Sequence, residues 1–172
     1  MDFLELSRER YSVRNFDPRP VGEETLEKIL EAGRLAPTAV NAQPQKIYLL
    51  KSREALEKLR GVTRMAYNAP VVLMVCYDEK VSWKATPYGD TYDSGEMDAS
   101  IVTTAMMMQA AELGVGSLWA RGFKAGDIEK AFALPENIHL VCLLDLGYPA
   151  KEGGPSERHS LRKPLSETVT EL

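Results

Sequence analysis

The chain has 172 residues, of which 44% are hydrophobic and 27% are charged, and its formal net charge at pH 7 is −4. This composition excludes a disordered chain, a collagen-like fibre and a disulfide-stabilised scaffold, and the length suits one globular domain over residues 1–172. The acidic balance argues against nucleic acid or an anionic membrane as the main partner, because both repel a negatively charged protein.

The first part of the chain predicts two helices separated by an irregular segment. Asp2 followed by Glu5 resembles a capping pair, which predicts a short helix ending near Arg8. Two prolines exclude a regular helix from residues 10–21. Apolar residues at helical spacing then predict a helix over residues 23–36, which a proline ends.

The middle of the chain predicts strands and a long loop. A strand is expected over residues 46–51, followed by a short helix that Ser52 can cap. The valine-rich run over residues 70–77 is typical of a strand buried on both faces. Residues 78–94 form a polar loop with several aromatic residues, and loops of this length are usually functional or mobile.

The last predicted elements indicate an α+β fold. Residues 96–113 are apolar around much of the helix circumference, which predicts a long central helix. Strands over residues 116–119 and 139–146 enclose a short helix over residues 127–133, and the polar tail from about residue 150 to 172 lacks a core of its own. No Gly-x-Gly-x-x-Gly follows a strand, so a dinucleotide-binding doubly wound sheet is disfavoured.

Targeting and cysteine signals indicate a cytoplasmic protein. No stretch approaches the ~20 apolar residues of a membrane span, and residues 1–5 lack the pattern of a signal peptide. Cys76 and Cys142 lie in apolar runs, which predicts buried free thiols in a reducing compartment. With only two histidines and no Cys-x-x-Cys, we expect no metal site. The acidic charge and the lack of an apolar span lead us to expect no membrane partner.

Positive charge gathers near the start of this acidic chain. In an extended segment, Arg10, Ser12 and Arg14 share one face, and two guanidinium groups beside a hydroxyl can bind an anion. The alternative is a solvated basic turn whose arginines pair with the nearby carboxylates Glu5, Glu9 and Asp17. A second basic cluster in the tail includes Arg162, and its alternative is an ordinary polar tail.

Two turns carry further residues that could contact a ligand, either through polar side chains or through a glycine. The turn between the second helix and the first strand contains Pro37, Thr38, Ala39, Asn41 and Gln43. Its hydroxyl and amide groups can recognise the polar edge of a ring, or they can serve local turn chemistry. After the strand over residues 116–119, Arg121 and Gly122 follow, and the glycine permits either a close approach of a flat ligand or a simple turn.

Five segments in this order resemble the FMN-dependent nitroreductase family. They are Arg10–Phe16, Ala36–Pro44, Leu113–Trp119, Leu146–Pro149 and Arg162–Leu165. The resemblance implies an α+β fold with a mixed, mostly antiparallel sheet flanked by helices and a long central helix. It also implies a homodimer with two FMN sites at the subunit interface.

The resemblance also implies roles for single residues. Those matching Arg10, Ser12, Arg14 and Arg162 hold the FMN phosphate. The turn matching Pro37, Thr38, Ala39 and Asn41 contacts the flavin of the partner subunit, and Gln43 lies in the same motif. Backbone near Arg121 and Gly122 approaches the reactive edge of the flavin, although several relatives carry an acidic residue where this chain has Arg121.

The activity implied is transfer of a hydride from NADH or NADPH, through flavin N5, to a small-molecule acceptor such as a nitroaromatic compound or a quinone, in a ping-pong scheme. The alternatives are a specialised flavin reductase, for example one that removes halogens, and a flavin-binding store or sensor without turnover. The loop over residues 81–92 is a candidate lid for an aromatic substrate, or it packs on the neighbouring subunit.

Overall fold

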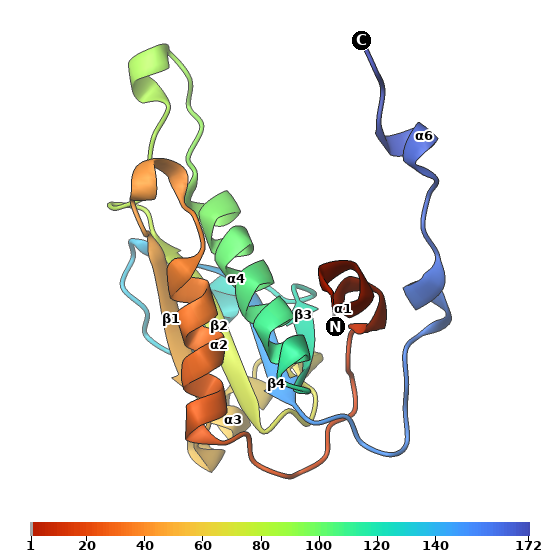
Figure 1. Ribbon diagram of the computed structural model, residues 1–172. Coiled ribbons are helices and arrows are strands. Elements are labelled where there is room, and N and C mark those ends of the chain that lie inside the picture. The colour runs from red at the N-terminus through yellow and green to blue at the C-terminus, as the bar shows by residue number, and fades with distance from the viewer. Residues whose placement is uncertain (1) are drawn as a thin grey trace.

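The computed structural model describes residues 2–172 and contains one antiparallel sheet with helices on both faces (Figure 1). The strands are β1 (Gln45–Leu50), β2 (Val71–Asp78), β3 (Gly116–Ala120) and β4 (Ile138–Gly147), in the order β1-β2-β4-β3. Each predicted strand is present, with its ends shifted by no more than one residue. The predicted α+β class is therefore confirmed.

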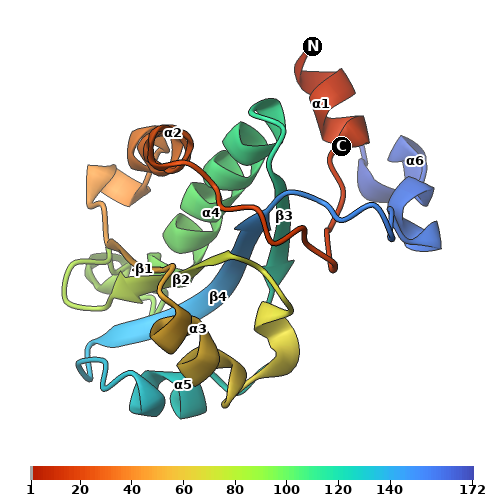
Figure 2. The same cartoon turned by 90° about the horizontal axis from the view of Figure 1, so that it is seen from below.

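The helices that cover the sheet lie in two layers, one on each face. Figure 2 shows α2 and α4 over one face and α3 and α5 over the other. The bounds are α1 (Phe3–Glu9), α2 (Glu23–Leu35), α3 (Arg53–Arg60), α4 (Gly95–Glu112), α5 (Ala125–Ala131) and α6 (Leu165–Thr168). Within residues 2–172, none of these helices is long and apolar enough to cross a membrane.

Local sequence signals explain where several helices begin. The Asp2 carboxylate accepts the N–H of Glu5 at 2.8 Å, and the Glu5 carboxylate accepts the N–H of Asp2 at 2.9 Å, so the predicted capping pair starts α1. The Ser52 hydroxyl accepts the N–H of Ala55 and starts α3. These contacts satisfy amide groups that the first helical turn leaves without partners.

The two main helices of one layer pack closely because Gly33 of α2 has no side chain. A Cβ at Gly33 would lie 2.7 Å from Cγ of Met106 on α4, so the fully buried methionine fills the space above the glycine. The central helix is less enclosed than predicted, however. Met97 and Ile101 near its start are 56% and 37% exposed, because no element within residues 2–172 covers that side.

The N-terminal segment extends the sheet at its β3 edge. Ser12 forms a parallel bridge with Ser117, and the N–H of Val13 donates to the Ser117 carbonyl oxygen at 3.0 Å. The sheet is therefore mixed at this edge, as expected. The tail after Pro149 is exposed over most of its length and runs beside α1 (Figures 1 and 2).

Candidate functional site

Residues 10–14, here called the basic segment, lie along the free edge of β3. Arg10 ends α1, and its guanidinium donates to Sδ of Met107, near the end of α4, at 3.8 Å. Ser12 is held by its bridge to Ser117, and the exposed Arg14 folds back to donate to the Ser12 carbonyl oxygen at 3.3 Å. The predicted cluster is thus fixed to the sheet by its backbone.

The arginines of the basic segment are not neutralised by neighbouring carboxylates. Among residues 2–172, neither Arg10 nor Arg14 forms an ion pair. Glu5 is occupied by the helix cap, and the Asp17 carboxylate accepts the N–H of Arg19 at 2.8 Å. The expected pairing of these arginines with Glu5, Glu9 or Asp17 is therefore not found within residues 2–172, and anion binding by the segment stays a prediction.

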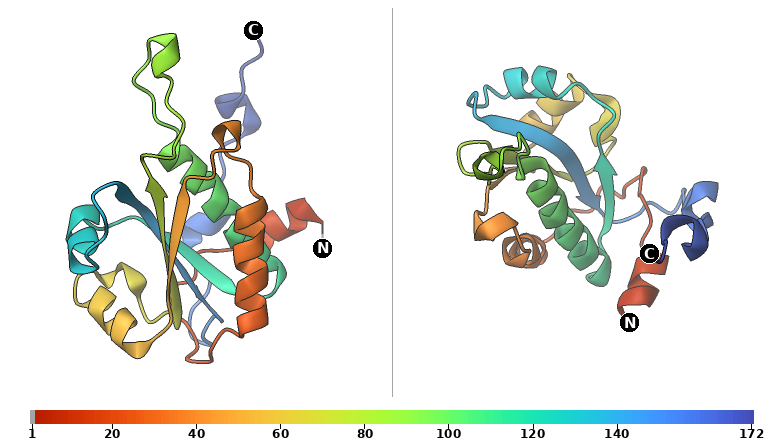
Figure 3. Two further views of the ribbon diagram at one scale, coloured as in Figure 1. Left: turned by 90° about the vertical axis from the view of Figure 1, so that its left-hand side faces the viewer. Right: turned by 90° about the horizontal axis from the view of Figure 1, so that it is seen from above.

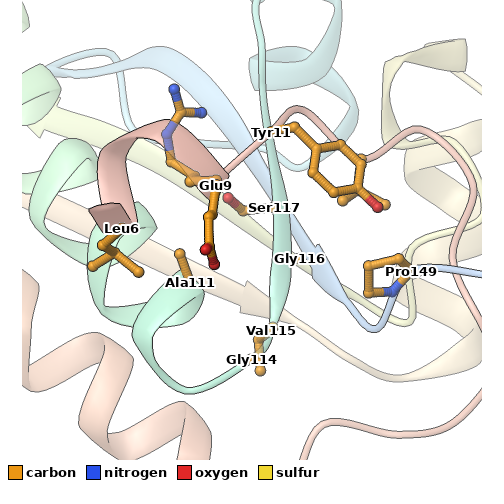
Figure 4. A pocket seen from close by; sticks show the side chains of 11 residues that line it. Leu6, Glu9, Tyr11, Ala111, Gly114, Val115, Gly116, Ser117 and Pro149 are labelled. Atoms are coloured by element: carbon orange, nitrogen blue, oxygen red, sulfur yellow. The ribbon is translucent and has the colours of Figure 1, made fainter. Parts of the chain in front are cut away.

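Two small pockets flank the basic segment. Arg10 and Ser117 line one of about 180 Å³ between α1 and the start of β3, where Glu9, Ser117 and Pro149 are labelled in Figure 4. Arg14 lines the other, of about 120 Å³. The Ser117 hydroxyl is buried and has no hydrogen-bond partner within residues 2–172. Both pockets are smaller than the ~300–1,000 Å³ of typical cofactor sites.

Arg162 lies in the tail rather than beside the basic segment. Its guanidinium donates to the carbonyl oxygens of His159 and Leu161 at 2.5 and 2.7 Å. Together with Arg8 and His159, it lines a pocket of about 390 Å³ between α1 and the tail. Nε2 of His159 lies 2.9 Å from the Arg8 carbonyl oxygen, so the tail is attached to α1 at this point.

The turn over residues 37–43, here called the flavin-side turn from its predicted role, has an unusual backbone. Val40, Asn41 and Gln43 have φ values of 47°, 57° and 53°, a left-handed region that non-glycine residues rarely adopt. The Thr38 hydroxyl accepts the N–H of Gln43 at 3.0 Å. The turn is also bonded to a residue outside it, because the N–H of Ala39 donates to Oδ1 of Asp98, at the start of α4, at 2.9 Å.

The basic segment and the flavin-side turn lie on opposite edges of the sheet. The turn leads into β1, and the basic segment runs along β3, which is three strands away. Three strand spacings amount to roughly 14 Å. The two segments also touch α4 nine residues apart, at Asp98 and Met107, which corresponds to about 14 Å of helix rise. One subunit therefore does not bring them together.

Arg121 and Gly122 follow β3 directly, on the same edge as the basic segment, and both are exposed. The Arg121 guanidinium donates to the Phe123 carbonyl oxygen at 3.2 Å. A Cβ at Gly122 would lie 3.1 Å from Sδ of Met65, so the segment that precedes β2 packs against this turn. No local sequence pattern predicts this contact, because Met65 lies far away along the chain.

The loop over residues 79–94 projects beyond the end of the sheet, next to the flavin-side turn (Figure 3, left). Lys84 pairs with Asp93 across its base, both by a backbone bridge and by an ion pair. The Trp83 ring lies 6.3 Å from that of Tyr88 and 6.2 Å from that of Tyr92, measured between centroids. The predicted aromatic loop is therefore present, with a paired base and neighbouring rings, and its role as a lid or as a subunit contact stays a prediction.

Comparison with known proteins identifies the family. The fold is that of an α+β protein, and the profile of the Nitroreductase family matches residues 7–66 and 63–148. A nitroreductase family protein from Clostridium difficile 630 is 40% identical, with a TM-score of 0.91, and the match covers 99% of this chain and 98% of that one. The chain belongs to the nitroreductase family.

Two further relatives carry names that bear on activity. A protein of Methanothermobacter thermautotrophicus, provisionally named an NADH dehydrogenase/NAD(P)H nitroreductase, is 32% identical over 161 residues, which are 90% of this chain and 81% of that protein. A provisionally named nitroreductase from Exiguobacterium sibiricum 255-15 was crystallised in complex with FMN. It is 22% identical, with a TM-score of 0.82, and the match covers 100% of this chain and 98% of that one.

Proposed function

We propose that this protein is an FMN-dependent oxidoreductase that takes electrons from NADH or NADPH and passes them to a small-molecule acceptor such as a nitroaromatic compound or a quinone. When bound, FMN supplies the hydride-transfer chemistry at N5. The family and the names of the relatives support this class of activity. The structure supports it through the donor set of the basic segment, which suits a phosphate.

The basic segment is the observation that carries the proposal. A phosphate monoester has a charge of about −1.5 to −2 near neutral pH, and Arg10 and Arg14 have no carboxylate partner within residues 2–172 to compete with it. Ser12 adds a hydroxyl donor between them. Arg162 would complete this group if the tail moves toward it or if a tail from another subunit reaches it.

The complete site is proposed to need two copies of the chain. The flavin-side turn and the basic segment lie on opposite edges of the sheet, and the pockets beside the basic segment are too small for a flavin. A homodimer that places the turn of one copy against the β3 edge of the other would join the two halves. The exposed Met97 and Ile101 on α4 and the apolar residues of the tail would then find partners.

In this arrangement, the residues of the chain bind and orient the cofactor. Arg10, Ser12 and Arg14 hold the phosphate, while the backbone of the flavin-side turn contacts the ring from the second copy. Backbone beside Arg121 and Gly122 lies near the reactive edge, where the exposed guanidinium favours an acceptor with negative charge. We further propose one domain over residues 1–172 and a cytoplasmic location, where the two buried free thiols stay reduced.

A short series of measurements tests the proposal. The purified protein is expected to show flavin absorption, to bind added FMN, to elute as a dimer, and to oxidise NADH or NADPH faster when an acceptor is present. Protein that binds no FMN would refute the assignment. Bound FMN without acceptor-dependent turnover would refute the oxidoreductase and favour a flavin store or sensor. A comparison of halogenated and nitro acceptors distinguishes a dehalogenating enzyme from a nitroreductase.

A further inference from the structure

A buried carboxylate joins the flavin-side turn to the central helix. Asp98 lies in the first turn of α4 and is only 2% exposed. Its Oδ1 accepts the N–H of Ala39 at 2.9 Å, and its Oδ2 accepts the hydroxyl of Ser94 at 2.7 Å. Both carboxylate oxygens thus have partners, as a buried charge requires.

The Ser94 hydroxyl extends this network to the projecting loop. While it donates to Asp98, it accepts the N–H of Trp83 at 3.1 Å, and the N–H of Ser94 in turn donates to the Trp83 carbonyl oxygen at 2.9 Å. Ser94 is 1% exposed, so water does not compete for these bonds. The loop base and the flavin-side turn are therefore attached to the same carboxylate.

The backbone of the turn requires such an attachment. Three non-glycine residues in it, Val40, Asn41 and Gln43, have left-handed φ values, and strained conformations persist only where surrounding contacts hold them. Within the turn, the carbonyl oxygen and hydroxyl of Thr38 accept the N–H groups of Asn41 and Gln43. These bonds are local. The bond from Ala39 to Asp98 ties the turn to the rest of the subunit.

We infer that Asp98 and Ser94 are positioning residues for the flavin site. Asp98 fixes the flavin-side turn, and Ser94 couples that turn to the aromatic loop of Trp83, so both segments present one rigid surface to the neighbouring subunit. The inference rests on the proposed function, because it assumes that the turn reaches the flavin of the second copy. If Asp98 only stabilised the positive N-terminal end of α4, loss of the charge on Glu96 would have the same effect as loss of the charge on Asp98, because both residues lie in the first turn of that helix.

Matched variants separate these roles. Asp98→Ala removes both bonds, and Asp98→Asn keeps an acceptor for the Ala39 N–H. Ser94→Ala removes the hydroxyl that joins Asp98 to the Trp83 N–H but leaves the bond from Ala39 to Asp98 in place. Glu96→Gln is the control for charge in the first turn of α4. Ser100→Ala is the control for a serine hydroxyl, because the Ser100 hydroxyl donates to the Glu96 carbonyl oxygen within the same helix. Each variant is studied as the flavin-loaded protein.

The measurements are the FMN dissociation constant, the absorption spectrum of bound flavin, the kcat and KM for an aromatic acceptor, and amide hydrogen exchange over residues 37–43. Asp98→Ala is expected to weaken FMN binding about tenfold, the equivalent of one charge-assisted hydrogen bond, to shift the flavin spectrum and to speed exchange in the turn. Asp98→Asn should restore most of the affinity. Ser94→Ala should leave FMN affinity near that of the wild type and raise KM for the acceptor.

Two outcomes would overturn the inference. The first is an Asp98→Ala protein that folds and retains wild-type FMN affinity, spectrum and exchange in the turn. The second is a Glu96→Gln protein in which FMN binding is weakened as much as in Asp98→Ala, which would assign the effect to helix charge. Asp98→Asn or Ser94→Ala, which preserve more of the network, decide the question if Asp98→Ala does not fold. A wild-type protein that binds no FMN would instead refute the proposed function, and hydrogen exchange would still test the attachment of the turn.

Discussion

Asp145 lies in the middle of the sheet with no exposed surface. Its register partners, Val72 on β2 and Leu118 on β3, belong to the core beneath α3 and α5, so the carboxyl group points into that core. Within residues 2–172, neither of its oxygens has a hydrogen-bond partner. A buried carboxyl without partners is costly to ionise, and this sets the expected response to pH.

Burial raises the pKa of Asp145 to about 8, although the positive charge of Arg60 opposes the shift. The folded protein therefore keeps a proton that the unfolded chain releases near pH 4. Because the folded state binds more protons across this window, stability is greatest at low pH and falls as pH rises toward 8. Linkage gives a loss on the order of 2–3 kcal/mol between about pH 6 and pH 9.

The variant Asp145→Asn keeps the shape of the side chain and removes the titration. The assay is urea unfolding of both proteins from pH 5.5 to 9, at fixed protein and flavin concentrations, because ligand and oligomer also affect stability. The free energy of unfolding of the wild type is expected to fall by roughly 1.4 kcal/mol per pH unit below the folded pKa, and that of the variant to stay nearly level. Parallel profiles would show that Asp145 is ionised in the folded protein and would refute this reasoning.

Three other predictions follow from local geometry. Arg14→Ala should weaken FMN binding by about tenfold to a hundredfold, since it removes a charge-assisted bond. Because Arg14 is exposed, the variant should still fold, and titration with FMN measures the loss of affinity. The control Arg34→Ala, which removes a surface ion pair, should leave the affinity unchanged. Gly95→Ala should destabilise the protein by about 1–3 kcal/mol in thermal unfolding, because a Cβ there would lie 2.0 Å from the Tyr77 ring, whereas Gly126→Ala, with open space around it, should not. The two buried thiols, whose pKa burial raises to about 12, should stay unreactive toward a disulfide reagent at pH 8 until the protein unfolds.

Local patterns in the sequence predicted most of the elements that position the site. The capping pair at Asp2 and the apolar spacing over residues 23–36 each determine a helix through contacts within a few residues. The valine-rich run at β2 predicts a strand buried on both faces, because such strands are apolar at every position rather than at alternate ones. The cluster of arginines in the basic segment was also visible, because an acidic chain has few such concentrations of positive charge.

The order of the strands and the contacts between distant segments could be obtained only from the tertiary structure. No local pattern states that β1 and β3 form opposite edges, and this arrangement separates the flavin-side turn from the basic segment. The link from Asp98 to Ala39 joins residues 59 positions apart, and its sequence signal was no more than an acidic residue in an apolar helix. Composition and periodicity report each segment's own preference for helix, strand or solvent, whereas the partner of a buried polar group depends on which segments the folded chain brings together.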